Sequence, residues 1–256
     1  MKLAALVSSV ATLLAAAPAA AQSGQATHHA EYRVAFLGLP VARANFTTVF
    51  EGSEFRVAGE MSSAGVANIV GRTSGATAVS GTVGEDKLHP EHYVVTYSSG
   101  DESQKMEVLF EDGDVVSAEL VPEKQRTRDD WIPTDPSDLS SVLDPVSGLM
   151  VPADAAVCDR TVEMFDGETR FDVHLTRVGE APFSAEGFEG QAIVCNATAE
   201  PLSGYHSKRS STEFIRQMSV EIWFARSEGA GVYAPVYARV PTKLGPVTVT
   251  ATRFGS

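Results

Sequence analysis

The sequence predicts an all-β protein made of one large, strongly curved antiparallel sheet of about a dozen strands. Apolar and polar residues alternate along segments such as Glu31–Phe36, which is the pattern of strands with one buried face. The dipeptides Asp112-Gly113 and Asp166-Gly167 each separate two such segments, as they do in tight hairpins. A sheet with this many strands must curl, split or close, so we expect a half-barrel, a barrel or a β-spiral.

The remaining elements follow from the same alternation. Further strands are predicted at 41–50, 54–61, 93–97, 105–110, 115–121, 161–165, 169–177, 191–196, 216–225, 236–240 and 247–254. One short helix is predicted near residues 144–151, because Asp144 is a good N-cap and Pro145 suits the first helical position. The charged segment 123–130 is predicted to be solvated. The concave side of such a sheet is either filled by side chains or holds a ligand.

The start of the chain has the features of a secretory signal peptide. The apolar segment Leu3–Ala17 follows Lys2, is too short to remain as a membrane span, and precedes small residues that end at Ala21. We therefore expect cleavage after Ala21 and a periplasmic mature chain without a transmembrane segment. The predicted organisation is a signal peptide at 1–21, a flexible linker at 22–29 and a single β domain at 30–256.

The chain is acidic, with 33 Asp and Glu against 20 Lys and Arg and a net charge of −13. A bulk charge of this sign excludes nucleic acid as a partner held by general electrostatic attraction. It also opposes adsorption to anionic membranes through net charge alone. The simplest role of the acid excess is to keep an exported protein soluble.

The chain contains two cysteines, Cys158 and Cys195. An even pair in a chain predicted to be exported indicates one structural disulfide. The Cys-x-x-Cys spacing that is typical of redox pairs is absent. The bridge would join the strand that enters the Asp166-Gly167 hairpin to the strand that ends at Cys195.

An ordered series of motifs covers nearly all of the predicted mature chain. Its members are Tyr32, Leu39–Ala42, Pro90, Tyr93, Asp144-Pro145, Ser147, Leu149, Cys158, Phe165-Asp166-Gly167, Arg170-Phe171-Asp172, Cys195, Pro201, Gly204-Tyr205, Glu221–Ala225, Pro235, Pro241-Thr242, Gly245, Thr252 and Phe254. This series resembles domain-of-unknown-function family 3108, which groups exported proteins of Gram-negative bacteria. The resemblance implies a periplasmic, β-rich protein, similar to half-barrel carriers of lipoproteins and to β-spiral proteins that support the cell envelope. It implies no catalytic residue.

The sequence contains no motif that is typical of a metal, cofactor or catalytic site. Pro90 lies between His89 and His92 and excludes the helical spacing of a zinc protease motif, so we expect no metal and no cofactor. No nucleophile elbow, phosphate-binding glycine loop or dinucleotide fingerprint is present. Acid pairs such as Asp129-Asp130 leave open a hydrolase that uses two carboxylates.

We therefore expect a non-enzymatic protein that supports cell-envelope integrity by binding a lipid, a lipoprotein or an envelope protein on the concave face of the sheet. The candidate binding residues are Arg170, Trp223 and Tyr205. Arg170 could hold a carboxylate or phosphate, or it could instead pair with Asp172 or Glu163. Two alternatives remain: a hydrolase of an envelope polymer with paired carboxylates, and a scaffold that pairs with another protein through a sheet edge.

Overall fold

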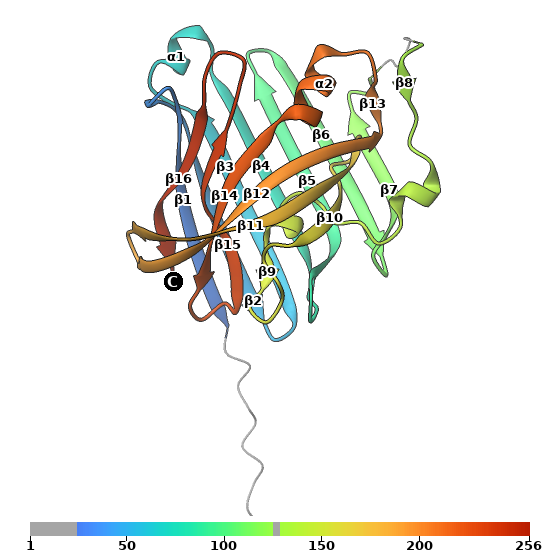
Figure 1. The fold of residues 1–256 in the computed structure, drawn as a ribbon. Helices are drawn as coiled ribbons and strands as arrows, with labels where there is room; N and C mark the ends of the chain where they lie inside the picture. The colour runs from blue at the N-terminus through green and yellow to red at the C-terminus, as the bar shows by residue number, and fades with distance from the viewer. Residues whose placement is uncertain (1–24, 125–128) are drawn as a thin grey trace, which may run out of the picture.

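The computed structural model describes residues 25–124 and 129–256, and the signal peptide predicted at 1–21 lies outside them. One antiparallel sheet of 14 strands runs through both halves of the chain (Figure 1). In sheet order its strands are β10 (Arg160–Phe165), β11 (Arg170–Ala185), β12 (Phe188–Ser203), β14 (Ser219–Ser227), β15 (Val232–Val240), β16 (Val247–Gly255), β1 (Ala26–Phe36), β2 (Leu39–Glu51), β3 (Glu54–Ser63), β4 (Thr73–Val83), β5 (Leu88–Ser99), β6 (Glu102–Glu111) and β7 (Asp114–Val121), with β9 (Val151–Pro152) paired to β15. The predicted fold class is confirmed.

The sheet curls back on itself without closing. Its end strands, β10 and β7, do not pair with each other among the described residues. The β10–β11 turn nevertheless lies against β6, since a Cβ atom at Gly167 would lie 3.3 Å from Cβ of Met106 and 3.4 Å from a methyl group of Val108. Phe165 of β10 shares a buried cluster with Val108. Side-chain packing therefore joins the two ends of the sheet into a barrel-like body.

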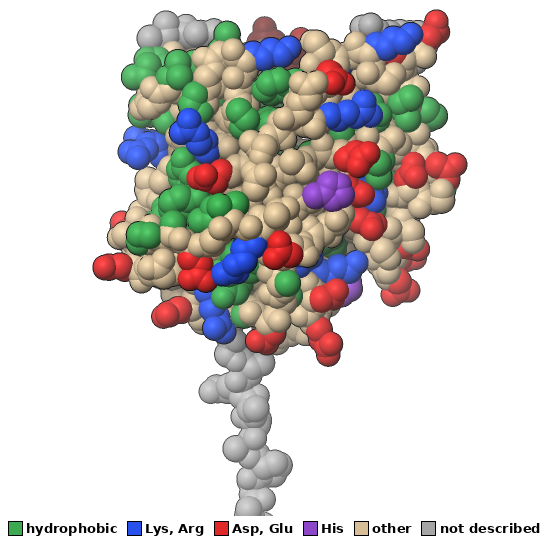
Figure 2. All heavy atoms as spheres, in the orientation of Figure 1, with side chains coloured by type: hydrophobic (Ala, Val, Ile, Leu, Met, Phe, Trp, Pro, Cys, Tyr) green, Lys and Arg blue, Asp and Glu red, His purple; other side chains and the backbone are tan. Residues whose placement is uncertain are grey.

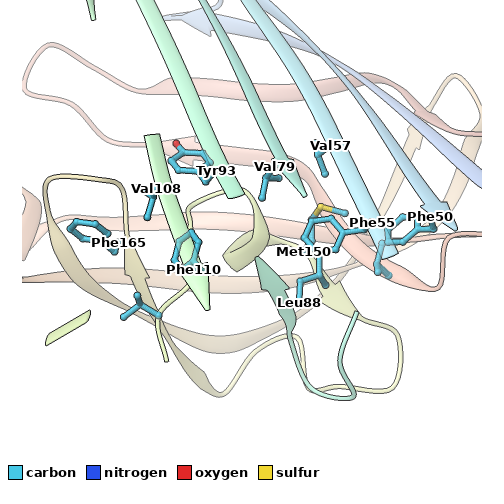
Figure 3. Close-up of a cluster of buried hydrophobic side chains, with 12 residues drawn as sticks. Phe50, Phe55, Val57, Val79, Leu88, Tyr93, Val108, Phe110, Met150 and Phe165 are labelled. Carbon is cyan, nitrogen blue, oxygen red and sulfur yellow. The ribbon is translucent and has the colours of Figure 1, made fainter. Parts of the chain in front are cut away.

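The concave side of the sheet is filled by the segment that links β7 to β10. This segment contains two short 3-10 turns, η1 (Pro136–Leu139) and η2 (Ser147–Leu149), and it places Val142 and Met150 in the core. Figure 3 shows Met150 and Phe55 next to each other, with Leu88 nearby and other members of the cluster on the neighbouring strands. The aromatic side chains on these strands are therefore core residues in this part of the barrel.

The short helix predicted near 144–151 is present as the single turn η2. The Asp144 side chain accepts hydrogen bonds at Oδ1 from the backbone N–H groups of Val146 and Ser147, at 2.9 and 3.0 Å, which is the bonding expected of a capping residue, although η2 begins later, at Ser147, with Val146 at its N-cap. Asp144 is fully buried, and this burial raises the pKa of its carboxyl group.

Several helix and strand assignments differ from the sequence-based expectation, including the short strands β8 (Trp131–Ile132), β9 and β13 (Tyr205–His206), which were not predicted. Helix α2 (Ser210–Gln217) occupies the start of the predicted strand 216–225, which begins instead at Ser219. Strand β4 was not predicted, because its Gly, Ala and Ser residues have weak strand preferences. The short helix α1 (Ala67–Val70) was also not predicted.

The flexible linker predicted at 22–29 is wrong for its described end, because strand β1 already begins at Ala26. His28 is only 3% exposed. Its Nδ1 is 2.7 Å from Oγ of Ser227, and its ring contacts Phe254 edge-on with the centroids 4.4 Å apart. Pairing with β2 and β16 therefore holds this segment in the sheet.

Burial of His28 predicts a loss of stability in acid. Burial, reinforced by the neighbouring His29, lowers the pKa of His28 from 6.5 to about 4. In the unfolded chain His28 is protonated below about pH 6.5, whereas in the folded chain it is protonated only below about pH 4. The free energy of unfolding therefore falls as the pH falls through this window. Between pH 6.5 and pH 4 the wild type should lose of the order of 2 kcal/mol of unfolding free energy that His28→Gln does not lose. Urea unfolding at a series of pH values measures this difference. His174→Gln, at a half-exposed position, is the control, and parallel profiles for the wild type and His28→Gln would refute the assignment.

The predicted disulfide between Cys158 and Cys195 is confirmed, with 5.8 Å between the two Cα atoms. Cys158 precedes β10 and Cys195 lies on β12, so the bridge spans β11. Both cysteines are buried in a cluster that includes Leu175 and Phe224. No described helix has the length and apolar character needed to cross a membrane.

Candidate functional site

A polar pocket of about 460 Å³ lies at one end of the barrel, where four separate segments meet. Its walls come from the small sheet of β8 (Trp131–Ile132) and β13 (Tyr205–His206), from the start of α2, from the β10–β11 turn and from Lys124. The lining residues are Lys124, Trp131, Glu168, Thr169, Gly204, Tyr205, His206, Arg209, Ser211 and Thr212. This volume suits the polar head group of a small ligand.

His206 of β13 lines the pocket, and Asp130 is buried behind it as its side-chain partner. Nδ1 of His206 lies 3.1 Å from Oδ1 of Asp130, and the two side chains are 11% and 5% exposed. Hydrogen bonds to the backbone carbonyls of both residues fix their positions: Ser207 N–H donates to the Asp130 carbonyl at 2.8 Å, and the Thr212 hydroxyl donates to the His206 carbonyl at 2.9 Å. Trp131 contacts the imidazole edge-on with the centroids 5.1 Å apart. The predicted solvation of segment 123–130 is therefore wrong at Asp130, and residues 125–128 lie outside the described chain.

The residues that line the pocket include two cations and one carboxylate, in a protein that is acidic overall. Lys124 and Arg209 line it together with one carboxylate, Glu168, whose Oε2 lies 2.5 Å from Nζ of Lys124. Arg209 lies exposed at the start of α2 and forms no ion pair with a carboxylate among the described residues. The aromatic rings of Trp131 and Tyr205 supply flat apolar surface beside these cations. This combination favours an anionic group attached to an apolar or ring-bearing body.

Gly204 sets the distance between β13 and the β10–β11 turn. Its φ angle is +73°, and a Cβ atom there would lie 1.7 Å from the carbonyl oxygen of Glu168. The Gly204 N–H donates to the Ile132 carbonyl at 2.8 Å, and Thr169 Oγ1 donates to the Gly204 carbonyl at 3.2 Å. Glycine is therefore required for both the backbone angle and the close approach that shape this wall.

The three predicted binding residues lie in different places. Tyr205 lines the pocket, and its hydroxyl accepts a hydrogen bond of 2.5 Å from Arg216, whose guanidinium also lies over the tyrosine ring. Trp223 lies away from the pocket, near Phe183 of the β11–β12 hairpin, and its Nε1 donates to Glu221 at 2.9 Å.

Arg170 is buried and its donors are used inside the protein. Its guanidinium donates to Asp172 at 2.5 Å, to Glu163 at 3.1 Å and to the backbone carbonyl of Asp138 at 3.0 Å. These contacts tie η1 to the β10–β11 hairpin, so Arg170 takes the structural role that the sequence left open.

Within residues 25–124 and 129–256, no three His, Cys, Asp or Glu side chains gather as a metal-binding group. His92 instead pairs with Glu107 on the neighbouring strand, with 2.7 Å between Nε2 and Oε1. Sequence reasoning did not select Lys124, Trp131, His206 or Arg209, and it named Asp130 only as part of an acid pair. These residues come from the connection after β7, from two short strands and from the start of a helix, none of which shows a strong periodic pattern.

Comparisons with known proteins agree with this fold. The sequence profile of the family described as "Protein of unknown function (DUF3108)" matches residues 31–252. The chain belongs to this family. The resemblance carried by the ordered motifs is thus confirmed for the DUF3108 chain. No curated protein matches it.

A solved structure shares the architecture of this DUF3108 chain. It is described as "Crystal Structure of Beta-barrel-like Protein of Domain of Unknown Function DUF1849 from Brucella abortus". The two structures align with a TM-score of 0.52 over 89% of this chain and 96% of the other, with 10% sequence identity. A similarity at this identity concerns the fold alone, and it matches the curled, barrel-like sheet seen here.

Proposed function

We propose that this DUF3108 chain is a non-enzymatic periplasmic binding protein that supports cell-envelope integrity. Its ligand would be the anionic head group of an envelope lipid or of a lipoprotein's lipid, held in the pocket between β13 and α2. The observation that carries this proposal is the sign of the local charge. Two cations, one carboxylate and two aromatic rings line the pocket, which leaves one cation, Arg209, without an ion pair among the described residues, in a chain whose net charge is −13.

The proposed compartment is supported by the start of the sequence and by the disulfide. A buried Cys158–Cys195 bridge suits an oxidising environment outside the cytoplasm. The apolar segment Leu3–Ala17 and the small residues before Gln22 have the pattern of a cleaved export signal.

The proposed site is at one end of the barrel and not deep within its concave side. Met150 and its neighbours fill the middle of that side with tightly packed apolar groups. A ligand there would have to displace a core segment, whereas the pocket beside α2 is open and already lined by polar donors. The pocket therefore replaces the central concave face as the proposed location.

Binding of an anionic lipid head group should depend on Arg209. We expect Arg209→Gln to weaken the affinity for a soluble, short-chain phosphatidylglycerol about tenfold, because a charge-assisted hydrogen bond is lost. Isothermal titration calorimetry would measure the affinity, and short-chain phosphatidylcholine would test the need for net negative charge. Lys208→Gln is the matched control, because Lys208 is the neighbouring exposed cation and does not line the pocket.

Native mass spectrometry of the protein isolated from the periplasm gives an independent test. A lipid-sized adduct on the wild type that diminishes in Arg209→Gln and persists in Lys208→Gln is the expected result. Absence of both an adduct and short-chain lipid binding would contradict the proposal. Equal binding by the two variants would show that the pocket is not the site.

The hydrolase alternative receives less support from this pocket. Two carboxylates facing each other across the site would be needed, at a separation of about 5 to 9.5 Å. Glu168 is the one carboxylate in the lining, and it is paired with Lys124. The His206–Asp130 pair orients an imidazole, but no hydroxyl group of the described residues hydrogen-bonds to Nε2 of His206. If the wild type hydrolysed an envelope polymer and His206→Gln did not, the hydrolase alternative would be favoured again.

The scaffold alternative is supported by strand β7. β7 is the last strand of the sheet, and its outer side has no strand partner among the described residues. Val116 and Val121 are exposed on it. An added strand from another protein could pair there. If substitutions in β7 abolished cross-linking to a partner protein and left lipid binding unchanged, the scaffold role would be favoured.

A further inference from the structure

Three turns gather at the end of the barrel that lies opposite the start of β1 (Figure 1). They are the β1–β2 turn at 37–38, the β3–α1 connection at 64–66 and the β15–β16 turn at 241–246. Backbone hydrogen bonds hold them together: Leu37 N–H donates to the Pro246 carbonyl at 3.2 Å, and Ala64 N–H donates to the Val41 carbonyl at 2.8 Å. We call this surface, together with Leu39 at the start of β2, the apolar rim.

The apolar rim exposes large hydrophobic side chains at its apex. Leu244 is 81% exposed, Leu37 is 59%, Leu39 is 56% and Val66 is 48%. Figure 2 shows hydrophobic side chains gathered at the upper left of the molecule, over this end of the sheet. Leu37 also lies against Gly245, where a Cβ atom would be 2.5 Å from its side chain, so the two turns form one continuous surface. Adjoining exposed apolar side chains of this kind indicate a binding surface.

Charge near the apolar rim has the opposite sign to that of the whole chain. Segments 36–42, 64–71 and 240–246 contain one charged residue, Lys243, and no Asp or Glu. Arg239 is exposed on β15 just behind the turn. Neither cation forms an ion pair with a described carboxylate. Lys243 instead lies over the Phe214 ring of α2, 5.8 Å from its centroid.

Two arginines extend this positive surface along the sheet. Arg33 and Arg43 are direct cross-strand partners on β1 and β2, and both are exposed. Like charges placed directly opposite each other destabilise a sheet. Their nearest strand neighbours of opposite charge, Glu31 and Glu60, form no ion pair with either arginine. An external anion would relieve this repulsion.

We propose that the apolar rim docks on the surface of an anionic phospholipid bilayer. Leu37, Leu39, Val66 and Leu244 would enter the boundary between head groups and acyl chains, and the cations behind them would contact lipid phosphates. Lys243 lies in the β15–β16 turn itself, whereas Arg33, Arg43 and Arg239 lie behind the apolar side chains, on the strands. Apolar groups in front of cations match the acyl chains and phosphates of a membrane surface. The net charge of the chain opposes general adsorption, so binding depends on this one end.

The position of α2 connects the apolar rim to the pocket. Phe214 of α2 contacts Lys243 of the rim, while Ser211 and Thr212 of the same helix line the pocket. A barrel docked through its rim would hold the pocket near the lipid head groups. The docking proposal stands on the rim alone and does not depend on the ligand proposed for the pocket.

Vesicle binding tests the proposal directly. The full chain, recovered from the periplasm, should float with vesicles of phosphatidylglycerol and phosphatidylcholine and bind pure phosphatidylcholine much less. We expect the double variant Leu39→Gln and Leu244→Gln to lower the partition coefficient about tenfold or more. Arg33→Gln and Arg43→Gln should each lower it about fivefold on the anionic vesicles only. All variants share one N-terminus, so any contribution from it cancels.

Matched controls come from other faces of the barrel. Leu109→Gln replaces an exposed leucine on β6, and Arg226→Gln replaces an exposed arginine at the far end of β14, and neither should change partitioning.

Circular dichroism and size-exclusion chromatography would show that the variants are folded. Unchanged partitioning of the leucine double variant would overturn the proposal. So would a stable dimer that dissociates in this variant, because the rim would then bind a second copy. Arg209→Gln should keep vesicle binding, which separates a failed pocket proposal from a failed rim proposal.

Discussion

Replacing Cys158 and Cys195 together with alanine is expected to lower the free energy of unfolding by about 4 kcal/mol. The bridge closes a loop of 37 residues in sequence, and opening it raises the entropy of the unfolded chain. Both side chains are also buried beside Leu175 and Phe224, so the change removes packed apolar atoms. The three strands at this end of the sheet depend on the bridge most directly, because it spans β10, β11 and β12.

Guanidinium unfolding of the oxidised wild type, the reduced wild type and the double alanine variant would measure this effect. The reduced wild type should approach the variant, and reducing agent should leave the variant unchanged. Equal midpoints for the oxidised and reduced wild type would contradict a structural role for the bridge. A redox role would instead appear as a readily reversible change at mild potentials.

Gly204→Ala is expected to lower stability by about 3 to 5 kcal/mol and to abolish binding in the pocket. A methyl group on this residue would lie 1.7 Å from the Glu168 carbonyl oxygen, so β13 and the β10–β11 turn must separate. The positive φ angle of +73° adds the usual strain of an L-residue in this region. Separation would move His206 away from Lys124 and Glu168 on the other side of the pocket.

Gly100→Ala separates the two causes of this loss. Gly100 has a φ angle of +59° but no atom within 4 Å of the position that its Cβ would take. It should therefore cost only the backbone strain, about 1 kcal/mol. Urea unfolding measures both variants, and lipid titration measures the pocket. Equal losses in the two glycine variants would show that close approach at Gly204 contributes little.

The sheet was predictable because its signals are local. Alternation along β1 and β2, and Asp112-Gly113 at the β6–β7 turn, each depend on neighbours in sequence. Asp112 and Gly113 do take positive φ angles of 52° and 89°, as a tight hairpin of this type requires. The hydrogen bonds from Val146 and Ser147 to the Asp144 side chain were predictable for the same reason, although the turn itself begins at Ser147. Strand β4 was not, because Gly, Ala and Ser carry little strand preference and tertiary pairing alone places it in the sheet.

The pocket and the apolar rim could not be predicted in this way. Asp130 and His206 are 76 residues apart and meet through a two-residue strand pair that has no periodicity to detect. Leu37 and Leu244 look like ordinary turn residues, and their common surface depends on the pairing of β1 with β16. Tyr205 was selected through the family resemblance, which marks a position without giving its neighbours.

The pairing of β16 with β1 has a consequence for biogenesis. Strand β1 enters the periplasm first if the chain is exported from its N-terminal end, yet one of its two neighbours is β16, the last strand in the sequence. Until Val247–Gly255 arrive, the nascent barrel consists of two unjoined sheets with open edges. Such distant pairing slows folding and lengthens the interval in which chaperones and proteases compete for the newly exported chain.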